Sequence, residues 1–112
     1  MKRIDAVIRP SKLEEVKESL TAAGVTGLTI FEVKGFGRQK GHSELYRGTE
    51  YTVDFQPKVL ISVLVVEDLL EAAVKAIADS ARTGRIGDGK IFVTALDDVI
   101  RIRTNERGRD AI

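Results

Sequence analysis

Four stretches of the chain have the hydrophobic pattern of β-strands. In residues 3–9 apolar and polar side chains alternate, so that Ile4, Ala6 and Ile8 share one face. Residues 58–66 are almost continuously Val, Leu and Ile, which is typical of a central strand whose two faces are both covered. The predicted strands are residues 3–9, 28–36, 58–66 and 91–96.

Two stretches between these strands have apolar residues at the spacing of an α-helix. Both predicted helix starts have capping-box spacing, Ser11 with Glu14 and Asp68 with Glu71. Gly24 is a natural C-terminal end for the first helix. The apolar faces are Leu13, Val16, Leu20 and Ala23 in the first helix, and Leu70, Ala73, Val74, Ile77 and Ala81 in the second.

The order strand, helix, strand, long connection, strand, helix, strand predicts an α+β fold. Two βαβ halves joined in this way form the ferredoxin-like βαββαβ arrangement, a four-stranded antiparallel sheet with both helices on one face. We expect residues 1–112 to form a single domain. The third strand is apolar on both faces and Val7 lies on the second face of the first strand, so the face without helices needs a cover. Copies of the same chain would supply it, which predicts a homo-oligomer.

Composition excludes several classes of function. The formal net charge is +1, which argues against a nucleic-acid-binding protein, because such surfaces have a clear basic excess. There is no cysteine and only one histidine, so disulfides, thiolate zinc sites and multi-histidine metal sites are excluded. Residues 1–10 lack the apolar run of a signal peptide, and residues 59–66 are too short to span a bilayer. We therefore expect a cytoplasmic protein without membrane insertion.

Two glycine-rich connections carry the candidate binding chemistry. The first, residues 34–58, is too long for a hairpin turn and too polar for a core, and connections of this length are usually functional or disordered. It resembles a GxGxxG fingerprint with one residue too many and no following helix, so a Rossmann site is rejected. The second, TGRIGDGK at residues 83–90, resembles a P-loop but has Ile91 where Ser or Thr is needed, and it leads into a strand.

The cations around these glycines still favour an anionic ligand. Arg38 on a glycine-flanked turn suits a phosphate, and Gly87 and Gly89 can present backbone N–H groups beside Lys90. A third cationic pair, Arg101 and Arg103, lies on one side of a predicted extended segment, residues 99–103, and the residues after it read as a loose tail. Each cluster alone also fits an ordinary glycine-rich connection or a solvated surface charge. Together they indicate a polyanionic small molecule such as a nucleotide.

A catalytic site is not indicated. His42 has no nucleophile near it in the sequence, and Asp88 between two glycines is typical of a turn. No pair of carboxylates has the spacing of a general acid and base. We therefore expect a protein that is not an enzyme.

The chain resembles the PII nitrogen-regulatory signal-transduction proteins over essentially its whole length. The matching strings are KGFGRQKGHSELYRGTEYTVD at residues 34–54, Pro57-Lys58, TGRIGDGKIF at residues 83–92 and VIRIRT at residues 99–104. The resemblance implies a homotrimer with ATP or ADP in clefts between subunits. Three segments would build each cleft: a T-loop at about residues 37–55, a B-loop at about residues 82–90 and a C-terminal segment at about residues 99–112. Ser11 departs from the family, in which an aromatic residue is common there.

The resemblance also implies which residues bind each effector. Mg²⁺ and 2-oxoglutarate would bind beside ATP, with the Gln39 oxygen as a magnesium ligand. The implied nucleotide-binding residues are Val7, Thr29, Gly35, Gly37, Arg38, Leu64, Thr83, Gly87, Asp88, Gly89, Lys90, Arg101 and Arg103. The implied 2-oxoglutarate-binding residues are Gly37, Gln39, Lys40, Gly41 and Lys58.

Regulation is expected to act through the T-loop. Tyr51 matches the tyrosine that a nucleotidylyltransferase modifies with a uridylyl or adenylyl group, whereas Tyr46 is expected to be a contact residue of the loop. The implied targets are an ammonium transporter or a regulator or enzyme of nitrogen metabolism, so membrane association would come only through a transporter partner. Three alternatives stay open: a slow ATPase using the same cleft, a PII-like sensor of another small molecule, and a purely structural oligomer.

Overall fold

The main sheet has the topology predicted from the sequence. In the computed structural model, residues 1–37, 43–46, 49–52 and 55–112 are described, with only the backbone for 43–46 and 49–52. The four-stranded sheet has the order β2-β5-β1-β6, with every neighbouring pair antiparallel. Its strands are β1 (Lys2–Ile8), β2 (Thr29–Gly35), β5 (Gln56–Val65) and β6 (Lys90–Ala95). The ferredoxin-like prediction is confirmed, and β5 is a central strand as its continuous apolar sequence indicated.

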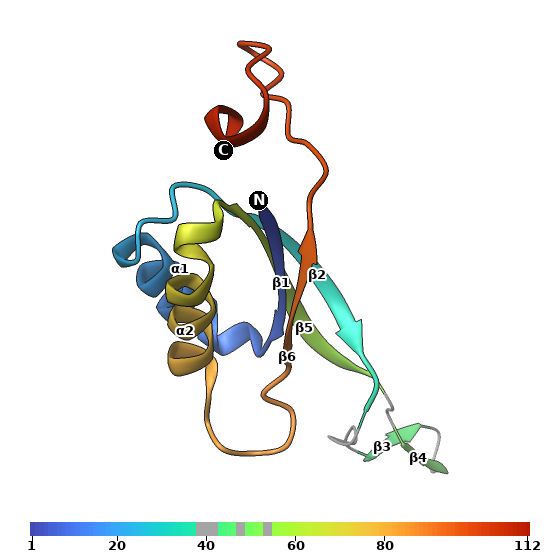
Figure 1. Cartoon of the computed structure of the whole chain (residues 1–112). Coiled ribbons are helices and arrows are strands. Elements are labelled where there is room, and N and C mark those ends of the chain that lie inside the picture. The colour runs from blue at the N-terminus through green and yellow to red at the C-terminus, as the bar shows by residue number, and fades with distance from the viewer. Residues whose placement is uncertain (38–42, 47–48, 53–54) are drawn as a thin grey trace.

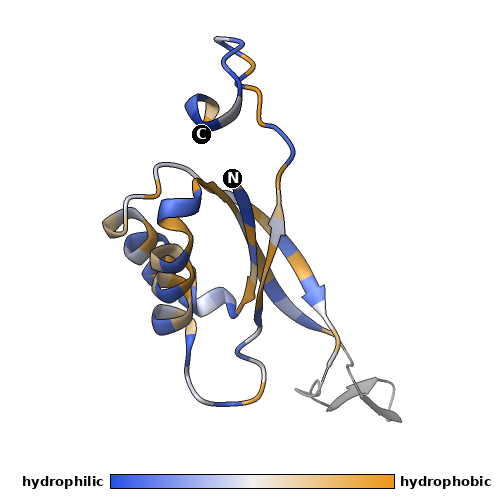
Figure 2. Cartoon of the chain, viewed as in Figure 1, coloured by the Kyte–Doolittle hydropathy of each residue, from blue (hydrophilic) through white to orange (hydrophobic). Residues whose placement is uncertain are grey.

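Two helices cover one face of this sheet and leave the other open (Figure 1). They are α1 (Leu13–Ala22) and α2 (Leu70–Ala81). Apolar residues concentrate where the helices meet the strands (Figure 2). The core lies in this layer and consists of Ile4, Ala6, Ile8, Val16, Leu20, Val25, Val59, Ile61, Val63, Val65, Ala73, Ile77 and Ala81.

Both helices begin differently from the prediction. Each is preceded by a short 3-10 turn, η1 (Pro10–Lys12) before α1 and η2 (Glu67–Leu69) before α2. Ser11 and Asp68 lie inside these turns, and no side chain caps either α-helix. The capping-box predictions are therefore wrong. The predicted end of the first helix is confirmed, because Gly24 follows its last turn with φ at +103°.

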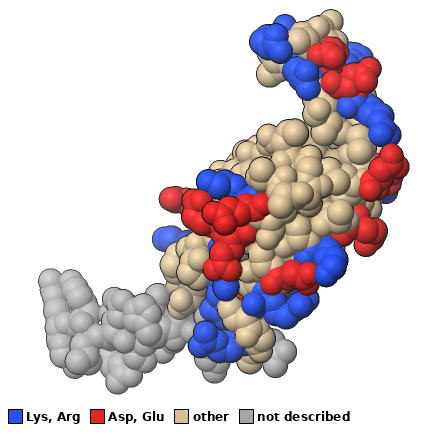
Figure 3. Space-filling model, turned by 90° about the vertical axis from the view of Figure 1, so that its left-hand side faces the viewer, with Lys and Arg blue, Asp and Glu red and all other residues tan. Residues whose placement is uncertain are grey.

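The helix-covered side carries charges of both signs. Figure 3 shows lysines, arginines, aspartates and glutamates distributed around an uncharged area on that side of the molecule. Among the residues that the structure describes, no helix is long and apolar enough to cross a membrane.

The open face of the sheet is apolar at several positions. Strand register places Phe31, Leu60 and Val7 in one row across β2, β5 and β1. Phe31 is 49% exposed, and Phe92 on β6 and Leu64 on β5 are 46% and 36% exposed. One carboxylate on this face is buried: Asp5 pairs with Arg3, whose Nε lies 2.9 Å from Asp5 Oδ2. Within one chain, this face therefore exposes apolar surface that another molecule could cover.

The connection between β2 and β5 contains a small antiparallel hairpin. Its strands are β3 (Ser43–Tyr46) and β4 (Thr49–Thr52), which pair with each other in a separate two-stranded sheet. The hairpin lies beyond the end of the main sheet that carries the pocket described below (Figure 1).

The C-terminal segment is more ordered than predicted. Residues 102–104 form a turn instead of an extended segment, and a bridge joins Ile100 to Arg107. The expected loose tail is also wrong, because residues 108–111 form the 3-10 turn η3 (Gly108–Ala111). Asp98 Oδ1 explains much of this order: it accepts hydrogen bonds from the backbone N–H groups of Val99 at 2.8 Å and Gly108 at 3.1 Å.

Candidate functional site

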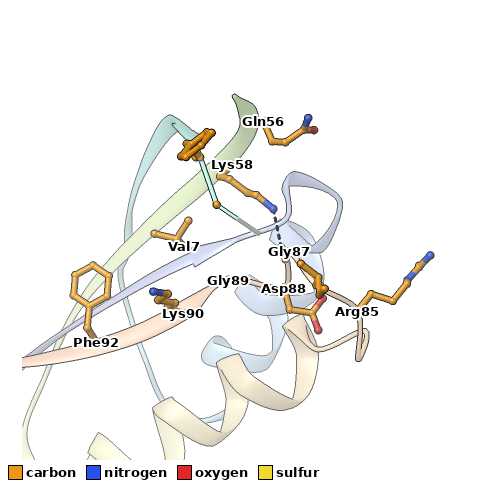
Figure 4. A pocket seen from close by; sticks show the side chains of 13 residues that line it. Val7, Gln56, Lys58, Arg85, Gly87, Asp88, Gly89, Lys90 and Phe92 are labelled. Atoms are coloured by element: carbon orange, nitrogen blue, oxygen red, sulfur yellow. Dashed lines mark hydrogen bonds between the residues drawn. The ribbon is translucent and has the colours of Figure 1, made fainter. Parts of the chain in front are cut away.

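A pocket of about 550 Å³ opens at one end of the sheet, where the T-loop leaves β2 and the B-loop runs into β6 (Figure 4). Antiparallel register brings its walls together: Gly35 at the end of β2 lies opposite Gln56 at the start of β5, and Val7 on β1 lies opposite Lys90 on β6. The lining residues are Val7, Gly35, Phe36, Gly37, Gln56, Lys58, Arg85, Ile86, Gly87, Asp88, Gly89, Lys90 and Phe92.

The B-loop approaches β1 more closely than any side chain allows. Gly89 has φ at +100°, and a Cβ atom built on it would lie 1.7 Å from the Val7 carbonyl oxygen. Only glycine combines this left-handed backbone with so close a contact. Gly87 also has positive φ, at +104°. Glycines in such conformations, here separated by Asp88, can leave backbone N–H groups accessible to an anion.

Asp88 holds the B-loop together from inside. Its Oδ2 accepts hydrogen bonds from the backbone N–H groups of Thr83 and Gly84, both at 2.8 Å. Its Oδ1 accepts from the Thr83 hydroxyl at 2.5 Å and from Arg9 Nε at 3.0 Å. These donors, the Thr83 hydroxyl first, lower the pKa of Asp88 well below its usual range. Asp88 is therefore an ionised acceptor whose charge is compensated by the protein.

Lys58 points into the pocket and contacts the B-loop. Its ammonium group donates a hydrogen bond to the Gly87 carbonyl oxygen at 2.7 Å (Figure 4). Burial, and then the neighbouring positive charge of Arg9, lower the pKa of Lys58 from its usual 10.5, while the Asp88 carboxylate raises it. An ammonium group on the pocket wall can bind a carboxylate or phosphate through a charge-assisted hydrogen bond.

The structure gathers part of the predicted site into this pocket. Its lining includes the predicted residues Val7, Gly35, Gly37, Lys58, Gly87, Asp88, Gly89 and Lys90. Thr83 belongs to the same loop, but its hydroxyl is used to hold Asp88. Arg38, Gln39, Lys40 and Gly41 lie outside the described residues. Tyr51 lies on β4, and its side chain is outside the described part as well.

Four predicted residues lie away from the pocket within one chain. Thr29 lies in the same row across the strands as Ser62 and Asp5, and Leu64 lies opposite Arg3. Because Asp5 and Arg3 are on the open face of the sheet, Thr29 and Leu64 are on that face too. Arg101 and Arg103 belong to the C-terminal segment, at the other end of the molecule from the B-loop (Figure 1). Arg101 donates to Glu106 Oε1 at 3.1 Å and to the Ile112 carbonyl oxygen at 3.3 Å.

Several pocket residues were not identified from the sequence. Gln56, Arg85, Ile86 and the aromatic residues Phe36 and Phe92 line the pocket. For Phe92 a signal existed, because it lies two residues after Lys90 in a strand and so shares its face. For Phe36, which stacks at a tilt on Phe55 with ring centroids 5.9 Å apart, no sequence signal marked the contact. Arg9 was missed too, although it contacts Asp88.

No group of three or more metal-ligating side chains of the His, Cys, Asp or Glu type occurs in the described ranges of the chain. The Mg²⁺ ligand implied by the family resemblance, the Gln39 oxygen, lies outside these ranges.

The chain matches one protein family over nearly its whole length. Residues 1–106 match the family model described as nitrogen regulatory protein P-II. The chain is 62% identical to the nitrogen regulatory protein P-II of Azospirillum brasilense and 62% identical to that of Cereibacter sphaeroides. It is 56% identical to the protein of the same name from Pasteurella multocida. Each alignment covers 112 residues, the full length of both chains.

Proposed function

Because the chain belongs to the nitrogen regulatory protein P-II family, we propose that this PII signalling protein is a homotrimer that binds ATP or ADP together with 2-oxoglutarate. Proteins of this family are regulatory signalling proteins. The observation that carries the ligand assignment is the pocket itself, in which Lys58, Lys90 and the glycines of the B-loop converge.

The phosphates of the nucleotide are proposed to lie against the B-loop. Gly87 and Gly89 line the pocket with positive φ, and Lys90 follows them at the start of β6. Phosphate oxygens are strong acceptors, and both backbone N–H groups and an ammonium group satisfy them. Asp88 does not oppose this binding, because its carboxylate is turned to donors of the protein.

The second effector is proposed to be 2-oxoglutarate, bound through Lys58. The ammonium group lies in the same pocket as the B-loop, and its lowered pKa reflects partial burial beside another cation. A carboxylate of 2-oxoglutarate would bind this ammonium group through a charge-assisted hydrogen bond. Together with Gln39, the nucleotide phosphates and this effector could complete an all-oxygen shell around Mg²⁺, the ligand type that this ion prefers.

A second copy of the chain is proposed to complete each site. The open sheet face carries half-exposed Phe31 and Phe92, which favours association. Thr29, Leu64 and Arg103 lie outside the pocket of their own chain, and copies packed over the open face could bring them to a neighbour's pocket. Nucleotide binding would then depend on assembly.

The T-loop is proposed to be the output. It joins the pocket directly, since β2 ends at Gly35 and β5 begins at Gln56 on the pocket wall. A ligand that favours one loop conformation shifts its population by the difference in affinity for the two conformations. The loop would then bind or release an ammonium transporter or a regulator or enzyme of nitrogen metabolism, and a transferase acting on Tyr51 would modify that choice.

Titration calorimetry of the assembled protein tests this proposal. ADP and ATP should bind, and 2-oxoglutarate should bind only when Mg²⁺ and ATP are present. Lys58→Met should abolish 2-oxoglutarate binding and leave ADP binding largely intact. Lys75→Met is the matched control, because it removes the same charge on α2, where Lys75 pairs with Asp79. Nucleotide binding without any response to 2-oxoglutarate would overturn the dual-effector assignment, and no nucleotide binding would overturn the whole proposal.

A further inference from the structure

The Arg9 side chain, which lies outside the B-loop, donates hydrogen bonds to two residues of that loop. It follows β1 directly, and its guanidinium group donates from Nε to Asp88 Oδ1 at 3.0 Å and from Nη2 to the Ile86 carbonyl oxygen at 2.9 Å. The side chain is 19% exposed, so this contact is partly protected from solvent. A planar guanidinium group can make both bonds at once, whereas an ammonium group offers no such fork.

The same carboxylate closes the loop upon itself. Asp88 accepts from Thr83 and Gly84 at the beginning of the B-loop, while Asp88 itself lies near its end. Arg9 therefore anchors a closed ring of backbone to the end of β1. Gly87, whose N–H group is a candidate phosphate donor, lies between the two atoms that Arg9 contacts, Ile86 O and Asp88 Oδ1.

Charge compensation is the second consequence of this pair. Asp88 lines the pocket that is proposed to receive phosphates, and an unpaired carboxylate there would repel them. The ion pair with Arg9 and the hydrogen bonds from Thr83 and Gly84 compensate the negative charge of the Asp88 carboxylate.

We propose that Arg9 is a positioning residue, which acts through Asp88 to hold the B-loop in the conformation that receives the nucleotide phosphates. This inference rests on the proposed nucleotide site and adds a residue that does not itself contact the phosphates. Arg9 and Asp88 act as a unit, so that losing either member releases the loop.

The test compares ADP with adenosine, which has no phosphates, on Arg9→Met, Asp88→Asn and the double variant. Each single change should weaken ADP binding about tenfold, the effect expected from losing one hydrogen bond to a charged group. The double variant should bind ADP as tightly as the single variant with the lower affinity, because both changes break the same contact. Adenosine should bind all variants within about twofold of the wild type, because the base and ribose do not need the loop.

Lys17→Met is the matched control. It removes the same charge on α1, where Lys17 lies 2.9 Å from Glu14 and is 48% exposed. It should leave ADP binding unchanged. Arg9→Lys separates pairing with Asp88 from direct contact with the ligand. It should recover ADP affinity relative to Arg9→Met only when Asp88 is present, because lysine can still pair with that carboxylate. If Arg9→Met fails to fold, Arg9→Lys and Asp88→Asn carry the comparison.

Three results would overturn the inference. The first is that the losses of ADP affinity add up in the double variant. The second is that Arg9→Lys recovers ADP affinity in the Asp88→Asn background. The third is that ADP and adenosine lose affinity equally. The first two would indicate direct contact of Arg9 with the ligand, and the third a general folding defect. Failure of the wild type to bind ADP would instead overturn the proposed function, so the two failures are distinguishable.

Discussion

Replacing Gly89 by alanine tests whether the close approach of the B-loop to β1 shapes the phosphate site. The new Cβ would lie 1.7 Å from the Val7 carbonyl oxygen, and Cβ atoms essentially never come within 3.0 Å of an atom outside their own residue and its chain neighbours. The two segments must therefore separate by about 1.3 Å. Because the obstacle is backbone, no side-chain rotation can relieve it.

Two costs follow from this change. The residue has φ at +100°, and holding alanine in such a conformation costs roughly 1–3 kcal/mol of stability. The separation also moves the backbone N–H groups that are proposed to face the phosphates. Losing one hydrogen bond to a charged group costs about 1.5–3 kcal/mol, so ADP affinity should fall at least about tenfold.

Gly84→Ala is the matched control for backbone strain. Gly84 has φ at +88°, but a Cβ atom there would meet nothing within 4 Å. Thermal unfolding should show a loss of stability for both variants, whereas calorimetry with ADP should show weaker binding for Gly89→Ala alone. Equal ADP affinity in the two variants would refute the reasoning, because strain without the clash would then account for every effect.

Two further predictions concern the loop charge and the open face. Asp88 has a folded-state pKa below its usual 3.8, so its carboxylate adds stability above that value and loses it as the pH falls through the lowered pKa. Urea unfolding should therefore show wild type more stable than Asp88→Asn near neutral pH, and the gap should close in strong acid. Phe31→Glu should reduce self-association measured by light scattering, because it places a charge on the apolar sheet face, whereas Ala72→Glu on the outer side of α2 should leave it unchanged. A persistent gap in acid, or equal assembly of the two glutamate variants, would contradict these expectations.

The fold was predictable because the hydrophobic periods agree with the final packing. The alternation in residues 3–9 predicted β1, and the helical spacing of Val16 and Leu20 predicted α1. Val16 and Leu20 are both buried in the core. The helix starts were not predictable from capping patterns alone. Ser11 and Asp68 have capping residue types, but each lies in a 3-10 turn that precedes the α-helix.

Sequence motifs located the two loops of the pocket but not the long-range contact that holds the B-loop in place. Glycines and cations mark the B-loop locally, whereas Arg9 and Asp88 are 79 residues apart and meet only through the strand register. The C-terminal segment shows the opposite error. The alternation of Ile100 and Ile102 with arginines indicated an extended segment, yet local hydrogen bonds to Asp98 bend the chain into a compact hairpin.

The internal bracing of this C-terminal hairpin has a consequence for the proposed assembly. Arg101 donates hydrogen bonds to Glu106 and to the Ile112 carbonyl oxygen, so the segment is folded upon itself within one chain. Ile102 at its turn is 99% exposed, an unfavourable position for a large apolar side chain unless a partner covers it. A preformed unit that presents Arg103 beside such a residue is suited to dock on a neighbouring copy with little loss of conformational entropy. Assembly and completion of the nucleotide site are therefore expected to be one coupled event, in which nucleotide stabilises the oligomer as much as the oligomer strengthens nucleotide binding.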